Sequence, residues 1–226
     1  KAGEGKHVLP KNPVLLTFDD AYISYYNFVV PILEKFGYPS VLAVVGSFID
    51  NPPEGLAEPL MNWDQLKEVA SKRLVEVVSH TYDLHKDIQY NPQGNVGSAV
   101  FVRAYDPNTK TYETEEEYRA RMEGDFNRQN TLFTRYLGFT PRGVVWPYGR
   151  YTAVIMEIAK KANYRFGFTV EEGYAHIDRL HEINRIMIKN KPIKEFIKEI
   201  KKPNPEKPGI RAVQVDLDMI YDPSSY

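Results

Sequence analysis

The sequence lacks features that are typical of several other classes of protein. It contains no cysteine, which excludes disulfide bonds and thiolate metal ligands. It has no run of 18 or more apolar residues, so no membrane-spanning helix is expected. Neither sign of charge dominates, because 29 Lys and Arg residues are balanced by 30 Asp and Glu residues. A nucleic-acid partner is therefore not expected, since such proteins concentrate positive charge on one surface.

The chain also begins without an initiator methionine or a signal peptide. Its first residues, 1–6, are polar and lead into an extended segment. We therefore expect the chain to be an excised or processed piece of a longer protein. What is present is 226 residues with 42% hydrophobic content, which is enough for one sizeable core. Sixteen tyrosines against two tryptophans suit a sugar-binding surface, because aromatic faces pair with sugar rings.

Short apolar runs alternate with helical patterns along the chain. Strands are expected at 14–18, 41–45, 74–78, 142–146, 164–170 and 183–188, with another from residue 212. Helices are expected at 24–36, 62–70 (capped by Asn62 or by Asp64), 113–137, 151–162 and 192–200. The third of these should begin at Thr114, which forms a capping box with Glu117. This alternation predicts an α/β fold with a parallel sheet.

Three segments show no such periodicity. Residues 50–61 are rich in proline and should form a loop, and residues 86–111 should form a long functional or mobile loop. Residues 201–210 are rich in lysine and proline and are typical of a linker between domains.

Polar or conformationally special residues follow five of the predicted strands. They are found at 19–20, 46–47, 79–80, 147–148 and 171–172. In barrels and in open parallel sheets alike, catalytic and ligand-binding residues gather at the carboxyl ends of the strands. We therefore expect one site at that edge of the sheet.

Asp19 and Asp20 follow the first strand directly. Side chains alternate along a strand, so the two carboxylates should point in different directions and can take different roles, such as metal ligand and proton acceptor. A solvated acidic turn is the alternative for such a pair taken alone.

His80 and His85 follow the third strand. With Asp20 they offer two imidazoles and one carboxylate, a set that suits a catalytic Zn²⁺ or a related divalent ion with an open position. The turn between the histidines must fold back to bring them together. Asp83, inside that turn, is either a partner for an imidazole N–H or, as the preferred interpretation, an ordinary turn residue.

Three motifs in order carry a resemblance to a known family. Residues 17–20 (Thr-Phe-Asp-Asp), 79–85 (Ser-His-Thr-Tyr-Asp-Leu-His) and 146–149 (Trp-Pro-Tyr-Gly) resemble the polysaccharide deacetylase family over nearly the whole chain. Within it, the chain is most similar to deacetylases of poly-β-1,6-N-acetyl-D-glucosamine (PNAG), a biofilm exopolysaccharide. The four residues between the two histidines match that branch.

The resemblance implies a fold and a set of roles. The fold would be a distorted, incomplete (β/α) barrel, circularly permuted in the PNAG branch. Asp20, His80 and His85 would hold one divalent metal ion (Zn, Co, Ni or Fe), and Asp19 would be the general base. Tyr148 would donate its backbone N–H to an oxyanion hole. The residues expected to contact the substrate are Pro147, Tyr148, Trp146 and Tyr82.

The acid that protonates the departing amine is not identified in the sequence. In the PNAG branch, this histidine precedes the first motif by many residues. Here His7 is the only upstream histidine, and it lies in the lead-in to the first strand. His176 and His181 follow strand ends but match no motif, and exposed loop histidine is the preferred interpretation of both. We therefore expect the segment that carries the acid to be absent, which predicts metal binding with weak or no deacetylation.

Several further residues have two interpretations. Trp146 is either a core residue, which is preferred, or a platform for a sugar ring. Arg185 either orients Asp19 or lies on the surface. The tyrosines Tyr22, Tyr25 and Tyr82 are candidates for lining the substrate groove.

These observations predict a metal-dependent de-N-acetylase of a PNAG polymer, acting in the periplasm or at the outer membrane. Residues 1–200 would form the deacetylase domain, with its N-terminal part missing. Residues 211–226 would either begin a C-terminal, glycoside-hydrolase-like, glycan-binding domain or form a last strand. The alternatives for function are a carbohydrate-binding or scaffold domain without the acid, and a deacetylase of another N-acetylated glycan.

Overall fold

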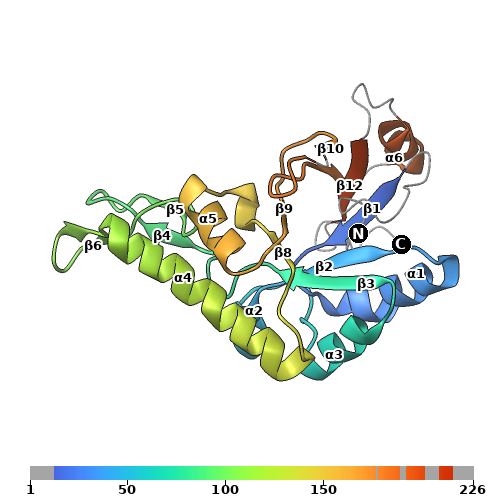
Figure 1. Ribbon diagram of the computed structural model, residues 1–226, viewed down its shortest axis with the longest axis horizontal. Helices are drawn as coiled ribbons and strands as arrows, with labels where there is room; N and C mark the ends of the chain where they lie inside the picture. Colours follow the sequence, from blue (N-terminus) through green and yellow to red (C-terminus); the bar gives the residue numbers. More distant parts are fainter. Residues whose placement is uncertain (1–12, 177, 189–191, 202–208, 216–226) are drawn as a thin grey trace.

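The computed structural model describes residues 13–176, 178–188, 192–201 and 209–215 (Figure 1). Within them, seven parallel strands are ordered β11-β12-β1-β2-β3-β8-β9. Their bounds are β1 Val14–Phe18, β2 Ser40–Val44, β3 Val75–Ser79, β8 Gly143–Val145, β9 Phe166–Phe168, β11 Arg185–Ile188 and β12 Gly209–Val215. The short β10 (Ala175–His176) pairs antiparallel with β12.

The two outer strands of this sheet are brought together by the segment that leads into β11. An isolated parallel bridge joins Phe168 to Ile183. Ile183 donates its N–H to the carbonyl of Gly167 at 2.8 Å and accepts from the N–H of Thr169 at 2.9 Å. The sheet therefore curls into a distorted barrel, which confirms the predicted α/β barrel class.

Alternate residues of the strands pack on opposite faces of the sheet. One set, which includes Val41, Ala43 and Val78, forms an apolar cluster with Phe168 and Ala212. The other set lies beneath the helices. Because both faces are covered by apolar side chains, the strands are continuous apolar runs, as expected for a buried parallel sheet.

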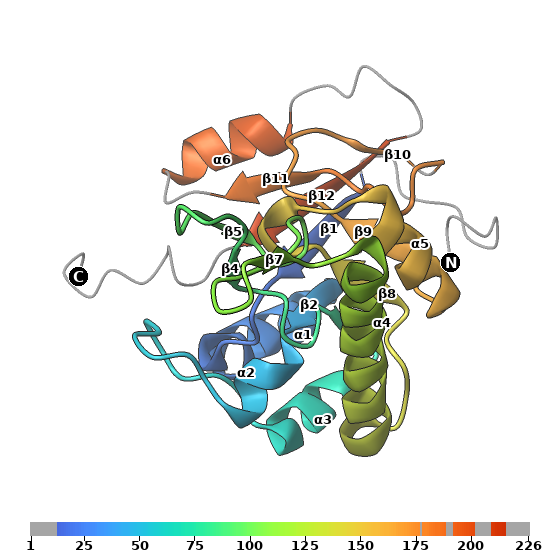
Figure 2. The same ribbon diagram turned by 90° about the vertical axis from the view of Figure 1, so that its left-hand side faces the viewer.

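Helices connect the strands on the outside of the barrel (Figures 1 and 2). Their bounds are η2 Tyr25–Val29, α1 Val30–Phe36, α2 Gly46–Asp50, α3 Trp63–Ser71, α4 Glu115–Leu132, η3 Phe133–Leu137, η4 Pro147–Gly149, α5 Ala153–Lys161 and α6 Ile193–Ile200. The five predicted helices are confirmed to within about two residues at each end, whereas α2 was not predicted. Asn62 and Thr114 each form a capping box, and Gly37 ends α1 in the left-handed conformation at φ 68°. None of the helices in the described ranges is long and apolar enough to cross a membrane.

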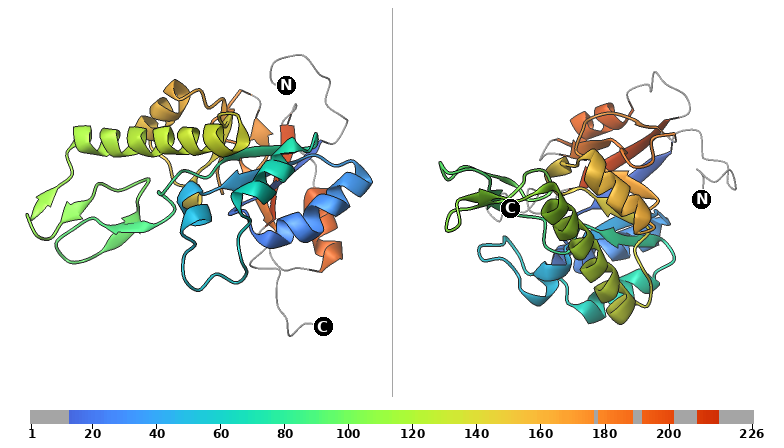
Figure 3. Two further views of the ribbon diagram at one scale, coloured as in Figure 1. Left: turned by 90° about the horizontal axis from the view of Figure 1, so that it is seen from below. Right: turned by 60° about the vertical axis from the view of Figure 1, so that its left-hand side comes forward.

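The prediction of one long loop over residues 86–111 is wrong. Two short hairpins occupy it: β4 (Asp87–Gln89) with β5 (Val96–Ser98), and β6 (Tyr105–Asp106) with β7 (Thr111–Tyr112). Figure 3 shows them projecting from the barrel beside one end of α4. Strands of two or three residues that bury little apolar surface leave no alternating pattern in the sequence, so these hairpins could not be predicted from periodicity.

The described part of the chain's last segment belongs to the same sheet. β12 lies between β11 and β1 and runs in register with β1, from Val14 opposite Arg211 to Phe18 opposite Val215. Most of the predicted linker and residues 216–226 lie outside the described residues, so a second domain there stays a prediction.

Candidate metal centre and active site

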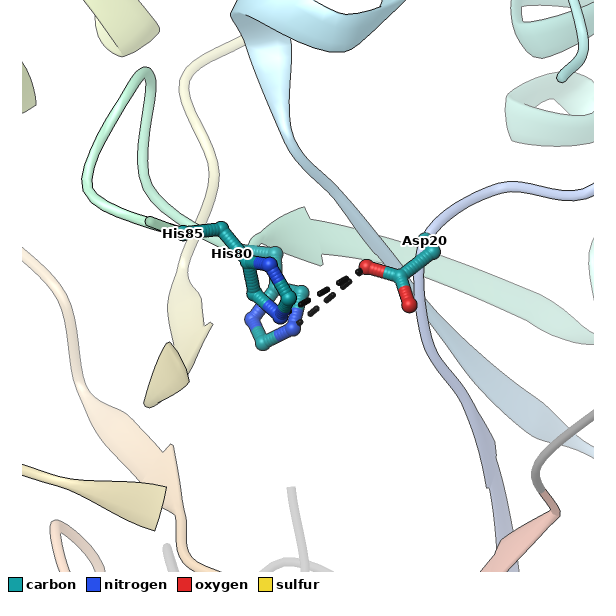
Figure 4. A group of neighbouring side chains, drawn as sticks. All are labelled: Asp20, His80 and His85. Carbon is teal, nitrogen blue, oxygen red and sulfur yellow. Dashed lines mark ion pairs between the residues drawn. The ribbon is translucent and has the colours of Figure 1, made fainter. Parts of the chain in front are cut away.

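Three side chains with metal-binding capacity converge at the carboxyl ends of β1 and β3. The Nε2 atoms of His80 and His85 lie 3.7 and 4.0 Å from Oδ1 of Asp20. One ligand atom from each residue lies within 4.8 Å of the others. Figure 4 shows both imidazole rings, which follow the end of β3, facing the Asp20 carboxylate at the end of β1. The predicted convergence of the two histidines with Asp20 is therefore what the structure shows.

Unusual backbone conformations make this convergence possible. Asp20, Ala21 and Thr81 all have positive φ angles, at 68°, 63° and 70°. Such angles are costly for residues with a Cβ, and they concentrate at functional sites where the surrounding structure enforces them. Here they turn the chain sharply at the ends of β1 and β3, where Asp20 and His80 lie.

The two imidazoles are held differently. Nδ1 of His80 lies 2.7 Å from the carbonyl oxygen of Val145, and we assign the proton to Nδ1, which leaves Nε2 as a lone-pair donor. The ring of His85 packs between Phe48 and Tyr148, with centroid distances of 5.7 and 4.6 Å. Both rings are thus fixed with Nε2 toward Asp20.

Burial keeps both imidazoles neutral. It lowers the pKa of His80, with the nearby Arg185 acting in the same direction, although Asp19 and the Val145 carbonyl oppose the shift. Burial and the neighbouring His80 lower the pKa of His85 to about 4, against the opposing effect of Asp20 and Asp19. Metal ligation needs neutral imidazole and ionised carboxylate, so this donor set fits a divalent ion of the Zn²⁺ type.

Asp19 pairs with Arg185. Nη1 of Arg185 donates to both carboxylate oxygens, at 2.9 and 3.0 Å, and Nε donates to the carbonyl of Thr169 at 2.7 Å. Burial raises the pKa of Asp19, but the charge and hydrogen bond of Arg185 outweigh it, with help from His80, and hold the pKa below its usual value. Arg185 is only 1% exposed, so the surface alternative for this residue is wrong.

The predicted oxyanion motif lies next to His85. Pro147 is buried at the start of η4, and Tyr148 adopts φ 55° and ψ 17°. The tyrosine ring is tilted against the imidazole of His85 and remains 46% exposed. The structure thus brings Asp19, Asp20, both histidines and Tyr148 to one edge of the barrel.

Comparison with known proteins agrees with this geometry. Residues 6–167 match the family model described as polysaccharide deacetylase. The chain belongs to this family. The three sequence motifs predicted the same family, and this prediction is therefore confirmed.

Individual polysaccharide deacetylases show the same relationship. The chain is 38% identical, over 98% of its length, to the poly-beta-1,6-N-acetyl-D-glucosamine N-deacetylase of Escherichia coli K12, and it spans about a third (34%) of that relative. Its fold resembles the BpsB deacetylase domain from Bordetella bronchiseptica, with a TM-score of 0.76 and 34% identity over 95% of this chain and 76% of that one. A de-N-acetylase from Aggregatibacter actinomycetemcomitans gives a TM-score of 0.79 and 33% identity over 88% and 79%.

Several candidate residues do not reach the centre. Trp146 is fully buried, with Nε1 donating to the carbonyl of His181 at 3.2 Å, so it is the core residue of the preferred interpretation and exposes no ring to a sugar. Tyr22 and Tyr25 are also core residues, at 5% and 0% exposure, and their groove-lining role is wrong. Tyr82 lies against α4 beneath the guanidinium of Arg128, and its contact with substrate stays a prediction.

Asp83 is a turn residue, as the preferred interpretation had it. It accepts a hydrogen bond from Ser47 at 3.2 Å and pairs with Lys86. Neither imidazole appears among these partners, so the role of orienting a histidine falls to the Val145 carbonyl instead.

The histidines considered as the acid remain unassigned. His7 and the side chain of His176 lie outside the described residues. His181 is partly buried, and burial together with Lys160 lowers its pKa while Glu182 opposes the shift. No residue of the metal centre is among the groups that act on its charge.

Two residues of α4 near the centre escaped sequence analysis. Asp125 accepts backbone hydrogen bonds from the turn between the two histidines, and Gln129 donates to the carbonyl of Val44 at 2.8 Å. The helical spacing of the sequence could have identified both residues. Met122, Phe126 and these two polar residues share one buried stripe, and a buried polar residue on such a stripe needs a partner.

Proposed function

We propose that this chain is a metal-dependent N-deacetylase that releases acetate from poly-β-1,6-N-acetyl-D-glucosamine outside the cytoplasm. One observation carries the proposal: the Asp20–His80–His85 cluster lies beside an Asp19 carboxylate held by Arg185, all at one edge of the barrel. The substrate is inferred from the name of the E. coli relative, to which the chain is 38% identical over 98% of its own length.

The cluster would hold one divalent cation, which we propose to be Zn²⁺, Co²⁺, Ni²⁺ or Fe²⁺. Bound there, the cation would supply Lewis acidity, which polarises a carbonyl group and lowers the pKa of water. Asp20 and the two neutral imidazoles provide the ligands without any proton having to leave the histidines first.

Residues of the chain would then accept the proton of the attacking water and stabilise the negative charge that develops on the substrate oxygen. Asp19 would accept a proton from the attacking water, because its lowered pKa keeps it ionised and Arg185 fixes its orientation. The backbone N–H of Tyr148 would donate to the tetrahedral oxyanion, a contribution worth roughly 3–4 kcal/mol for one donor. The exposed ring of Tyr148 would lie against the sugar, next to buried Pro147.

Acetate release from defined oligomers tests this function. The metal-free chain is reconstituted with each of the four ions and given β-1,6- and β-1,4-linked N-acetylglucosamine oligomers. We expect weak, metal-dependent acetate release that favours the β-1,6 linkage, because no acid is identified among the described residues. Equal rates on both linkages would point instead to a deacetylase of another glycan.

A second candidate is a glycan-binding domain that retains the metal but does not catalyse. It is favoured by the absence, among the side chains that the structure describes, of a third imidazole at the metal centre. Oligomer binding by the metal-loaded chain without acetate release would support this candidate against the first.

A further inference from the structure

The turn that joins the two histidine ligands depends on partners from other elements. It contains Thr81 at φ 70°, and only four residues separate His80 from His85. From one side, the N–H groups of Gly46 and Ser47 donate to the carbonyls of Thr81 and Tyr82 at 3.2 and 2.8 Å. These bonds use the carbonyls of the turn and leave its N–H groups to be satisfied elsewhere.

Asp125 satisfies two of them, those of Tyr82 and Asp83, from the opposite side. Its Oδ1 accepts the N–H of Tyr82 at 2.8 Å, and its Oδ2 accepts the N–H of Asp83 at 2.7 Å. Two consecutive backbone donors thus bind the two oxygens of one carboxylate. Hydrogen bonds to an ionised acceptor are stronger than neutral ones, so this contact restrains the turn in two places.

The site is built from buried groups. Asp125 is 6% exposed and lies on α4 among apolar side chains, beside a cavity of about 270 Å³ that Tyr82, Lys86 and Arg128 also line. Burial raises the pKa of Asp125 to about 6, although the two backbone hydrogen bonds oppose the shift. An apolar residue at this position would avoid the cost of burying a charge, so the carboxylate needs a compensating role.

One helical turn further along α4, Gln129 reinforces the same arrangement. It is fully buried, and its Nε2 donates to the carbonyl of Val44 at 2.8 Å. That carbonyl also accepts the N–H of His80 at 2.8 Å. One face of α4 therefore contacts the middle of the turn directly and is linked to its start through the Val44 carbonyl.

We propose that Asp125 is a positioning residue for the metal centre, which holds the turn so that His80 and His85 keep the separation one cation requires. This rests on the proposed function only in that the centre binds a divalent metal. Asp125 touches neither the ligands' rings nor any reacting atom. Its effect would pass through the backbone of the turn.

The test compares Asp125→Asn with Glu123→Gln. Both exchange a carboxylate for an amide on α4, but Glu123 is exposed, so it serves as the matched control. Zn²⁺ affinity of the metal-free chain is measured by competition with a chromophoric chelator. Hydrogen exchange of the turn amides and thermal unfolding of the metal-free form are measured alongside.

We expect Asp125→Asn to weaken Zn²⁺ binding by about 10–100-fold, the range seen when groups that orient metal ligands are lost. The amides of Tyr82 and Asp83 should exchange faster, and Glu123→Gln should match the parent in every measurement. Unchanged Zn²⁺ affinity in a folded Asp125→Asn protein would overturn the proposal. So would an equal loss of affinity in Glu123→Gln.

These results are separable from the proposed function. If the parent chain binds Zn²⁺ but releases no acetate, deacetylation fails while the affinity comparison still decides the role of Asp125. Asp125→Gln tests the same point should Asp125→Asn not fold, because its longer side chain retains one acceptor and should weaken Zn²⁺ binding relative to Glu123→Gln. An affinity of Asp125→Gln equal to that of the control would overturn the proposal.

Discussion

Nη1 of Arg185 lies 2.9 and 3.0 Å from the two carboxylate oxygens of Asp19, although 166 residues separate them in sequence. β11 and β1 are not direct neighbours, since β12 lies between them. The guanidinium therefore reaches across one strand, and on the way Nη1 also lies 3.3 Å from the hydroxyl of Thr17. A buried cation in this position keeps a buried carboxylate ionised.

Arg185→Lys should impair catalysis most strongly at low pH. Lysine keeps the positive charge but loses the bond from Nε to Thr169, so Asp19 is held less firmly and its pKa rises toward the usual range. The acid limb of the kcat/KM profile should shift to higher pH by about one unit, since a hydrogen bond to a charged group contributes about 1.5–3 kcal/mol. On that limb kcat/KM should fall by about tenfold, whereas at pH 7, where Asp19 is ionised in both proteins, it should stay close to that of the parent.

Arg142→Lys is the control for this prediction, because Arg142 pairs with Glu76 on the exposed side of the barrel. Its pH profile should equal that of the parent. A uniform loss across the pH range in Arg185→Lys would show that Arg185 does not act through the ionisation of Asp19.

His85→Ala should abolish metal binding, whereas His181→Ala should not affect it. His85 offers Nε2 to the cluster, while the charges that act on His181 come from Lys160 and Glu182. Removing one of three protein ligands should weaken Zn²⁺ binding by about 100-fold or more. Calorimetric titration of each metal-free variant measures this, and comparable affinities for the two variants would refute the assignment of the centre.

The stability of the metal-free chain should fall on acidification, partly because of His85. Its folded pKa of about 4 lies below the ordinary 6.5, so the unfolded chain takes up a proton first as the pH falls through 6.5. Between pH 7 and pH 5 this should remove about 2 kcal/mol from the free energy of unfolding. Asp125, with a folded pKa of about 6, acts in the opposite direction below that pH because its folded form takes up the proton first.

His85→Gln isolates the histidine from the carboxylate. Asp125 is present in both proteins, so its effect cancels in the difference between them. Urea unfolding with a chelator present should show a smaller loss of stability between pH 7 and pH 5 in His85→Gln than in the parent. Equal losses would mean that His85 is not buried in its neutral form in the metal-free chain.

Tyr148→Ala should separate the roles of the backbone and the ring. The substitution keeps the backbone N–H proposed for the oxyanion but removes the exposed ring over His85. We expect kcat to stay within about threefold while KM rises about tenfold, because aromatic contacts contribute about 0.5–1.5 kcal/mol beyond the area they bury. Steady-state acetate release over a range of oligomer concentrations gives both parameters, and a large loss confined to kcat would contradict this division.

How well each feature was predicted depends on how far apart in the sequence its residues lie. The apolar runs and the capping box at Thr114 are local, and they located most of the strands and helices to within a few residues. The metal ligands were predictable because Asp20 and His80 follow the ends of β1 and β3, His85 lies only five residues beyond His80, and the carboxyl ends of parallel strands share one edge.

Long-range polar contacts were not predictable in this way. The contact between Asp125 and Tyr82 joins residues 43 apart, and it depends on how α4 crosses the turn. The same limit applies to Trp146 and Tyr25, whose burial is decided by packing between elements that no single segment encodes. The metal ligands could thus be predicted from local sequence patterns, whereas the residues that hold those ligands in place could be identified only from the tertiary structure.

Thr114→Ala should destabilise the protein without affecting its metal centre. Thr114 caps α4 by accepting the N–H of Glu117 at 3.1 Å, and loss of such a cap costs about 1 kcal/mol. Asp125 lies about 15 Å further along the helix, so fraying of the first turn should not reach it. Urea unfolding should detect the lost stability, while Zn²⁺ affinity should equal that of the parent. If Zn²⁺ affinity fell as much in Thr114→Ala as in Asp125→Asn, the effect of Asp125 would be one of helix stability and not of contact with the turn.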